Sequence, residues 1–239
     1  KPTMKKLILL ITLSAGIFGC SSLELETVST SAEETQRILA MGLSHEENLI
    51  EAKKLKSDLM ISVVTLQLTN AKDEKIQAEI DKVESYKFSD LVNVSESGLK
   101  FIGAEISESL ATILSAGLDL QEYHLKGEKN SNSGIISHKL NLAFIHKSGS
   151  SRNYISANLC DEWGRCDGNN QEINVISENA TNCTSNSCQY REVLELNLSD
   201  DFLRNSADSG FTMRINSKRK TNKVKISKAY LMGYLKIAQ

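Results

Sequence analysis

The C-terminal half of the chain alternates between apolar and polar residues in short segments, which is typical of β-strands. In residues 135–147, for example, Leu140, Leu142 and Phe144 share one face with two histidines, while Lys139 and Asn141 point to the other. The pattern predicts strands over residues 118–126, 135–147, 152–159, 171–177, 189–198, 210–217 and 222–228. Polar turns rich in Gly, Asn and Ser separate most of them. Such repeats are typical of an antiparallel sandwich or a jelly-roll-like barrel.

The N-terminal half has a different pattern, with longer and more charged segments. Residues 32–57 predict a helix with one break, because Ser31 and Glu34 have the spacing of a capping box. Residues 58–69 are rich in Ile, Val, Leu and Thr and predict a strand. Residues 71–85 predict a charged amphipathic helix. We therefore expect an α+β fold, with an N-terminal helical segment followed by a mainly antiparallel β-sandwich or jelly-roll-like domain.

The first twenty residues combine positive charge with a short apolar run. Lys5 and Lys6 precede the apolar run 7–17, which is shorter than the roughly 20 residues that span a bilayer. The sequence Ile17-Phe18-Gly19-Cys20 follows. Residues 4–22 therefore resemble the signal of bacterial lipoproteins, whose lipobox is usually Leu-(Ala/Ser)-(Gly/Ala)-Cys, although a bulky residue replaces the usual small one. The alternative is a plain signal peptide or an N-terminal anchor.

The resemblance to lipoproteins implies a location and a lipid anchor. Cys20 would become the mature N-terminus, with a diacylglycerol on its sulfur and an acyl chain such as palmitate on its amine. Several acyl chains together anchor a protein stably, at about 0.8 kcal/mol for each buried CH₂. Ser21 stands where the enterobacterial sorting rule places Asp for retention at the inner membrane. The resemblance thus implies an outer-membrane lipoprotein that faces the periplasm or the cell surface.

These observations divide the chain into four expected parts. They are a lipoprotein signal peptide over 1–19, a tether over 20–31, a helical or mixed region over 32–117 and the β-sandwich domain over 118–239. The hydrophobic share of 40% and the charged share of 24% are ordinary for a globular protein.

The chain has five cysteines, and the lipid would occupy Cys20. The other four are Cys160, Cys166, Cys183 and Cys188. Three pairings are possible, and we favour 160–166 with 183–188 because short loops close first and an exported protein is exposed to oxidising conditions. A four-cysteine zinc site is the alternative, but its usual spacing is two to four residues in both halves.

Sequence patterns of the common catalytic sites are absent. The chain has no Gly-x-Ser-x-Gly, no His-Glu-x-x-His and no glycine-rich nucleotide-binding motif. We therefore predict that the protein is not an enzyme and has no cofactor. If 118–126 and 135–147 form a hairpin, His124 falls opposite His138, and such a pair can bind a metal weakly or respond to pH. Two ordinary surface histidines are the plainer interpretation, and we predict no metal site.

Two segments are candidates for partner binding. The loop between Cys160 and Cys166 contains Trp163 and Arg165, both residue types that are enriched at binding hot spots. Trp163 packing back over the disulfide is the alternative.

The second segment is basic: residues 209–239 contain eight basic residues and no acidic one. The candidate contact residues there are Arg214, Lys218, Arg219, Lys220, Lys223 and Lys225. Such a hairpin can contact phosphate, lipid head groups or an acidic partner. The alternative is an edge hairpin whose lysines prevent sheet-to-sheet aggregation.

Together these features predict a lipid-anchored envelope protein that acts as a non-enzymatic binding or assembly module. Its expected partners are the membrane, through the lipid, and an envelope protein. Nucleic acid is not expected, because basic and aromatic residues do not alternate as in single-strand binders. The alternatives are a lipoprotein that binds carbohydrate or another small ligand, and a hydrolase that acts on envelope polymers.

Overall fold

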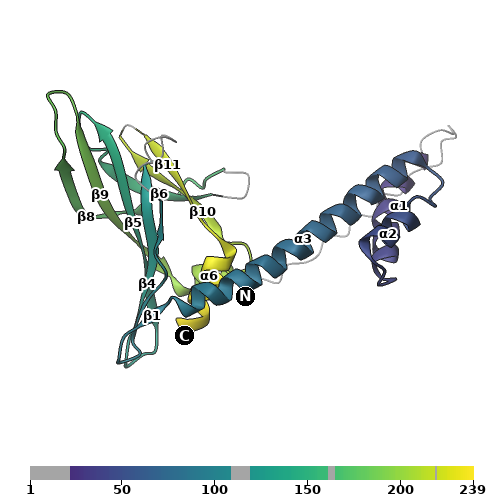
Figure 1. Cartoon of the computed structure of the whole chain (residues 1–239), viewed down its shortest axis with the longest axis horizontal. Coiled ribbons are helices and arrows are strands. Elements are labelled where there is room, and N and C mark those ends of the chain that lie inside the picture. Colours follow the sequence, from purple (N-terminus) through teal and green to yellow (C-terminus); the bar gives the residue numbers. More distant parts are fainter. Residues whose placement is uncertain (1–21, 109–118, 161–164, 219) are drawn as a thin grey trace, which may run out of the picture. The chain divides into compact units, whose positions relative to one another are not determined.

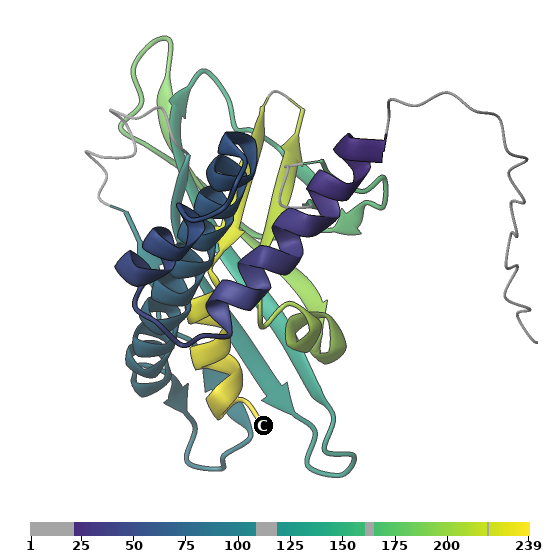
Figure 2. The ribbon, with the colours of Figure 1, turned by 90° about the vertical axis from the view of Figure 1, so that its right-hand side faces the viewer.

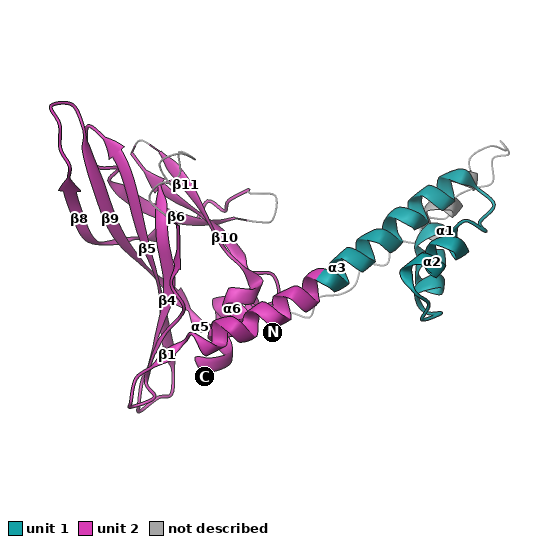
Figure 3. Cartoon of the chain, in the orientation of Figure 1, with its two compact units in different colours: residues 1–76 teal, residues 77–239 magenta. Residues whose placement is uncertain are grey.

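The computed structural model describes residues 22–108, 119–160, 165–218 and 220–239, with side chains from Ser31 onward (Figure 1). The described chain contains helices and two antiparallel sheets, so the predicted α+β class is confirmed. It divides into two compact units, residues 1–76 and 77–239 (Figure 3). No helix among the described residues is long and apolar enough to cross a membrane.

The N-terminal part consists of the helices α1 (Ser22–Leu39), α2 (His45–Ala52) and α3 (Asp58–Asp90). The structure differs here from two expectations. The expected tether over 20–31 is helical from Ser22, so Ser31 lies inside α1 and does not cap it. Residues 58–69 belong to α3 instead of a strand. The β-propensity of their Ile, Val and Thr residues is overridden because Val64 and Leu68 are buried against the other helices.

The first unit has a small apolar core of its own. It consists of Ile38, Ala52, Val64 and Leu68, which are at most 1% exposed. Gly42 adopts a φ of +67° in the turn between α1 and α2, a conformation that favours glycine. Ser44 then caps α2 in a capping box: its hydroxyl accepts from the backbone N–H of Glu47, whose carboxylate accepts from the backbone N–H of Ser44.

The second unit contains the larger sheet, in which the described strands follow the order β1-β2-β4-β5-β9-β8, with β3 paired to β4. The strands are β1 (Asn93–Val94), β2 (Lys100–Ile102), β3 (Ile106–Ser107), β4 (Leu120–Lys129), β5 (Ile136–Ser148), β8 (Asn174–Thr181) and β9 (Cys188–Ser199). All of their pairings are antiparallel. β5 pairs with β9 over twelve residue pairs and is the central strand of the unit.

The smaller sheet of this unit has the order β11-β10-β6-β7. Its strands are β6 (Tyr154–Cys160), β7 (Gln171–Glu172), β10 (Phe211–Ser217) and β11 (Thr221–Ile226). Figures 1 and 2 show this sheet facing the larger one. The two sheets share one core, to which the larger contributes Leu140, Leu142, Phe144, Leu194 and Leu196 and the smaller Met213, Ile215, Val224 and Ile226.

Two short helices complete the unit. α5 (Asp200–Asn205) is capped by Ser199, whose hydroxyl accepts from the backbone N–H of Phe202. The apolar pattern of residues 230–237 is compatible with either a strand or a helix, and in the structure these residues lie in α6 (Lys228–Ile237). Tyr230, Leu231 and Tyr234 of this helix belong to the shared core.

The strand predictions for residues 118–228 agree with the structure apart from one segment. Residues 171–177, expected as a single strand, divide at the buried Ile173 into β7 and β8, which belong to different sheets. The sequence also predicts a short helix over 107–116, most of which lies outside the described residues. Both favoured disulfides are present, Cys160–Cys166 and Cys183–Cys188.

The contact between α6 and the end of α3 gives a test of this packing. A Cβ added at Gly233 would lie 2.5 Å from the carbonyl oxygen of Ser85 and 2.6 Å from Cβ of Phe88. We predict that Gly233→Ala lowers the free energy of unfolding by about 1–3 kcal/mol, because the overpacking outweighs the better helix propensity of alanine. Urea denaturation measures this change. Gly168→Ala is the control, since nothing lies within 4 Å of its added Cβ. An equal effect of the two substitutions would contradict the packing.

Candidate functional site

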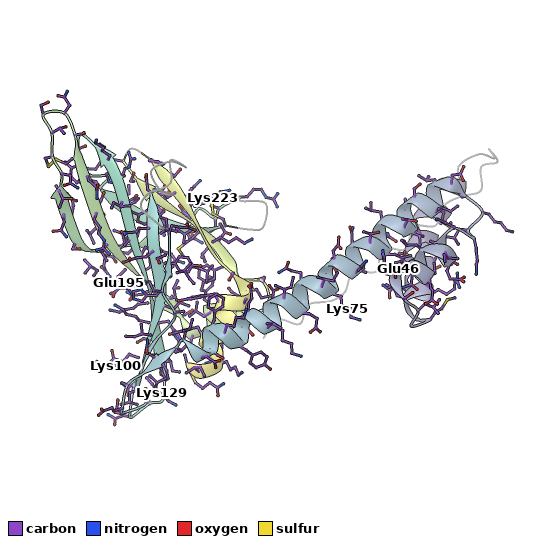
Figure 4. The ribbon with its side chains drawn as sticks, viewed as in Figure 1. Glu46, Lys75, Lys100, Lys129, Glu195 and Lys223 are labelled. Atoms are coloured by element: carbon purple, nitrogen blue, oxygen red, sulfur yellow. A yellow bond between two sulfur atoms is a disulfide. The ribbon has the colours of Figure 1, made fainter. Side chains whose placement is uncertain are left out.

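The outer face of the smaller sheet is basic because its inner face is apolar. Met213, Ile215, Val224 and Ile226 are all 0% exposed. Since successive side chains of a strand point to opposite faces, Arg214, Lys223 and Lys225 lie on the outer face. Lys223 and Lys225 are exposed, and Figure 4 shows Lys223 directed away from the larger sheet. The alternation along β10 and β11 thus directs these four apolar side chains inward and the three basic side chains outward.

Arg214 and Lys223 lie directly opposite each other in the antiparallel register of β10 and β11. The Cβ atoms of directly opposed residues are about 5 Å apart, and like charges in this position destabilise a sheet. Lys225 faces Thr212 instead and has no opposing charge. Within the described part of the chain, no carboxylate lies at ion-pair distance from Arg214, Lys223 or Lys225.

The surroundings of Arg214 leave its guanidinium partly unsatisfied. Nη2 donates to Oδ1 of Asn158 at 3.4 Å, and the buried Nε has no hydrogen-bond partner. The same Oδ1 accepts from Nδ2 of Asn216 at 2.7 Å, so it is already engaged. Arg214 is therefore held in place on a polar sheet face without a full set of acceptors.

Amide side chains form a fixed network beneath Arg214. Nδ2 of Asn158 donates to Oδ1 of Asn170 at 2.9 Å and to the carbonyl oxygen of Asn169 at 3.0 Å. Nδ2 of Asn216 also donates to the hydroxyl oxygen of Ser156 at 3.1 Å. Asn158, at the centre of the network, is only 3% exposed, whereas Asn169 and Asn170 are exposed. These bonds hold the face rigid and orient the arginine.

The other predicted contact residues do not lie with Arg214, Lys223 and Lys225 on this face, or lie outside the described residues. Lys218 is exposed, but Nζ of Lys220 forms an ion pair with Asp119 at 3.2 Å and so turns away from the outer face. Arg165 is exposed next to the disulfide. Cys20, Trp163 and Arg219 lie outside the described residues. The structure thus brings together Arg214, Lys223 and Lys225, and it separates Lys220 from them.

Asp119 belongs to a second polar region, at the end of the sandwich where the two sheets meet. It forms ion pairs with Arg152 at 3.3 Å and with Lys220. Nδ2 of Asn222 donates to the hydroxyl oxygen of Tyr154 at 2.9 Å. Burial, with a smaller contribution from Asp119, raises the pKa of Tyr154, so this hydroxyl stays neutral at physiological pH.

Next to this region lies a buried carboxylate that sequence reasoning missed. Glu192 is 0% exposed, and its Oε1 lies 2.9 Å from Nε2 of His146 and accepts from the backbone N–H of Arg152 at 2.8 Å. Nδ1 of His146 lies 3.1 Å from the hydroxyl of Ser148. Only the register of β5 and β9, which are far apart in sequence, brings the histidine and the carboxylate together.

A serine, a histidine and a carboxylate in contact are the groups of an acyl-transfer site. Here, however, the hydroxyl of Ser148 donates to the carbonyl oxygen of Ser150. A serine nucleophile would instead donate to the histidine. The network of Glu192, His146 and Ser148 ties β9 to the end of β5 and to the loop that follows.

The expected pair of His124 and His138 does not form. In the actual register His124 faces Asn141 and His138 faces Gly127, because the turn closes between Asn130 and Ile135 and the hairpin is centred later than expected. His124 lies on the outer face of the larger sheet and His138 in the core. Among the described residues, no group of three His, Cys, Asp or Glu side chains could hold a metal ion.

His138 instead joins both short helices to β5. Its Nδ1 lies 2.9 Å from the hydroxyl of Tyr234 on α6, and its Nε2 lies 3.0 Å from Oδ1 of Asp200 on α5. Burial lowers the pKa of His138 although Asp200 opposes the shift. Burial also disfavours ionisation of Asp200, but hydrogen bonds from Arg204 and His138 outweigh it and lower the pKa of Asp200.

Comparison with known proteins adds no identification. No protein-family model, no curated protein and no solved structure matches this chain.

The lowered pKa of His138 predicts a pH dependence of stability. The folded state resists protonation of His138, so stability is complete above the unfolded pKa of about 6.5 and is lost as the pH falls through and below it. We predict that the melting temperature falls less between pH 7 and pH 5 in His138→Gln than in the wild type. Thermal unfolding across this range measures the difference.

His124→Gln provides the comparison for this measurement. Burial also lowers the pKa of His124, so both histidines contribute to the wild-type slope in the same direction. The pKa of Asp200 lies below its ordinary value, outside this pH range. The same slope in His138→Gln and the wild type would contradict the assignment.

Proposed function

We propose that the chain is a lipid-anchored envelope protein that acts as a non-enzymatic binding or assembly module, and that the outer face of the smaller sheet contacts a negatively charged partner. The observation that carries this proposal is the group of Arg214, Lys223 and Lys225 on one face, without a carboxylate partner among the described residues. Complementary charge steers association and fixes the register of an interface.

Protection of a sheet edge explains only part of this charge. β11 is an edge strand, so Lys223 and Lys225 are placed where lysines prevent unwanted strand pairing. β10 lies inside the sheet, between β11 and β6, where no free edge needs protection. Arg214 therefore requires another explanation, and contact with an anionic group provides one.

The proposed location rests on two features of the chain. The leader with the lipobox-like sequence ending at Cys20 supports export and lipid attachment. The disulfides Cys160–Cys166 and Cys183–Cys188 are typical of oxidising compartments outside the cytoplasm. With Ser21 after the cysteine, we propose attachment at the outer membrane, with the module facing the periplasm or the cell surface.

Binding of a small ligand is the second candidate function. An open depression of about 390 Å³ lies beside β2 and is lined by residues that include Leu91, Ile102, Glu105 and His124. Its volume is within the range of small-molecule sites. It supports the alternative of a carbohydrate or small-ligand binder, but few polar groups converge in it.

Lipid attachment is testable at one residue, Cys20. We predict that cells supplied with labelled palmitate incorporate the label into the wild-type protein and not into Cys20→Ser, because the cysteine sulfur and amine are the proposed attachment points. Gel electrophoresis of the immunoprecipitated protein measures incorporation. Ser21→Ala is the control and should be labelled like the wild type. Labelling of Cys20→Ser, or an unlabelled wild type, would show that the anchor is assigned wrongly.

The contact face is testable by partner capture from native membranes. We predict that Arg214→Glu/Lys223→Glu reduces recovery of the crosslinked partner at least tenfold, or about 1.4 kcal/mol, because the face becomes negative. Quantitative mass spectrometry of the crosslinked material measures recovery.

The matched control for this capture is Lys75→Glu/Lys82→Glu, which makes the same change of charge at exposed positions of α3. It should leave recovery unchanged. If both double variants recover the partner as the wild type does, the basic face is not the contact surface.

A further inference from the structure

The pair of Arg214 and Lys223 carries an electrostatic conflict that the described fold does not relieve. Arg214 and Lys223 are directly opposed in the antiparallel register, so their charged side chains lie side by side on the same face of the sheet. No described carboxylate lies between them, and the network beneath them consists of neutral amides of Asn158 and Asn216. An ion pair with a carboxylate of the same chain would relieve this repulsion. The described residues provide no such carboxylate.

The guanidinium of Arg214 also has N–H donors without a hydrogen-bond acceptor. Arginine presents five N–H groups in a rigid fork. One of the five is engaged by a long hydrogen bond to Asn158, and the buried Nε–H has no acceptor. The two terminal nitrogens can bind an oxyanion in a bidentate contact.

Lys225 lacks the like charge directly opposite that Arg214 and Lys223 present to each other. It lies on the same strand and the same face as Lys223, two residues further along, but it is opposed by Thr212. It has no like charge directly opposite, and Arg214 is only its diagonal neighbour, at the larger spacing of about 7–8 Å. The conflict and the unsatisfied donor therefore coincide at one place, between Arg214 and Lys223.

We propose that Arg214 and Lys223 form a binding site for a phosphate-type oxyanion, either as free phosphate or as a phosphate monoester on a lipid head group. This inference rests on the proposed function and names the chemical group that the basic face recognises. A phosphate monoester carries a charge of about −1.5 to −2 at pH 7, which matches two adjacent cations, whereas a carboxylate matches one. Arginine binds such a group with its planar fork and lysine as a point charge.

The test uses the purified full chain in a non-ionic detergent and follows the Nε–H resonance of Arg214 by NMR. The resonance is assigned by its loss in Arg214→Gln. Inorganic phosphate is titrated at constant ionic strength against sodium chloride. The inference predicts a saturable shift of this resonance with phosphate and not with chloride, and an affinity that falls about tenfold in Lys223→Gln.

Lys225→Gln is the matched control, because it removes the same charge from the same face without touching the opposed pair. It should weaken phosphate binding less than about threefold, as expected for a screened neighbouring charge. An equal loss in Lys223→Gln and Lys225→Gln would reduce the site to a general charge effect and overturn the inference.

Two further titrants separate the sources of the anion. Glycerol phosphate represents the head-group ester, and acetate represents a carboxylate. Tighter binding of glycerol phosphate than of phosphate identifies the head group as the source, and the reverse order identifies free phosphate. Binding of acetate as tight as phosphate, or no phosphate-dependent shift at all, overturns the inference. In either of those cases the partner capture described above still decides the proposed function, since it needs no phosphate.

Discussion

The shared core between the two sheets is the constraint on which the rest of the second unit depends. Met213, Ile215, Val224 and Ile226 are fully buried against the larger sheet. Burying each of these side chains contributes on the order of 1.5–3 kcal/mol, so the register of β10 and β11 is strongly determined. A slip of one residue would bury Arg214 and Lys223, at a cost that no described partner offsets. The basic outer face is thus a direct consequence of the apolar inner one.

The two ends of β5 are held by buried polar networks. At one end His138 contacts Tyr234 and Asp200, and this contact joins α6 and α5 to the sheet. At the other end His146 contacts the fully buried Glu192. Buried groups of this kind are costly unless each is paired, and paired groups favour one arrangement of the strands over its alternatives. They therefore help to position the hairpin that carries the basic face.

The sequence predicted those features that depend on local pattern. The alternation of apolar and polar residues located the strands of the second unit, and the short spacing between cysteines indicated Cys160–Cys166 and Cys183–Cys188. The outward direction of Lys223 and Lys225 followed from the same alternation. Residues 58–69 were misassigned because a buried helix and a buried strand have similar compositions.

Features that depend on register could not be predicted in this way. The pairing of His146 with Glu192 and that of Lys220 with Asp119 join residues that are 46 and about 100 positions apart. These contacts follow only from the order in which the strands pair and from the exact register of each pair. A small error in the position of the turn between β4 and β5 was enough to place His124 wrongly opposite His138. The asparagine network beneath Arg214 likewise becomes visible only when β6 and β10 are paired.

The central claim is that partners meet the outer face of the smaller sheet, and site-specific photo-crosslinking in intact cells tests it most directly. A photoreactive residue would replace Thr221, which is exposed on the outer face of β11, or Lys147, which is exposed on the outer face of the larger sheet. The account predicts a discrete crosslinked product from position 221 and none from position 147. A product from position 147 alone would contradict it and move the contact to the larger sheet.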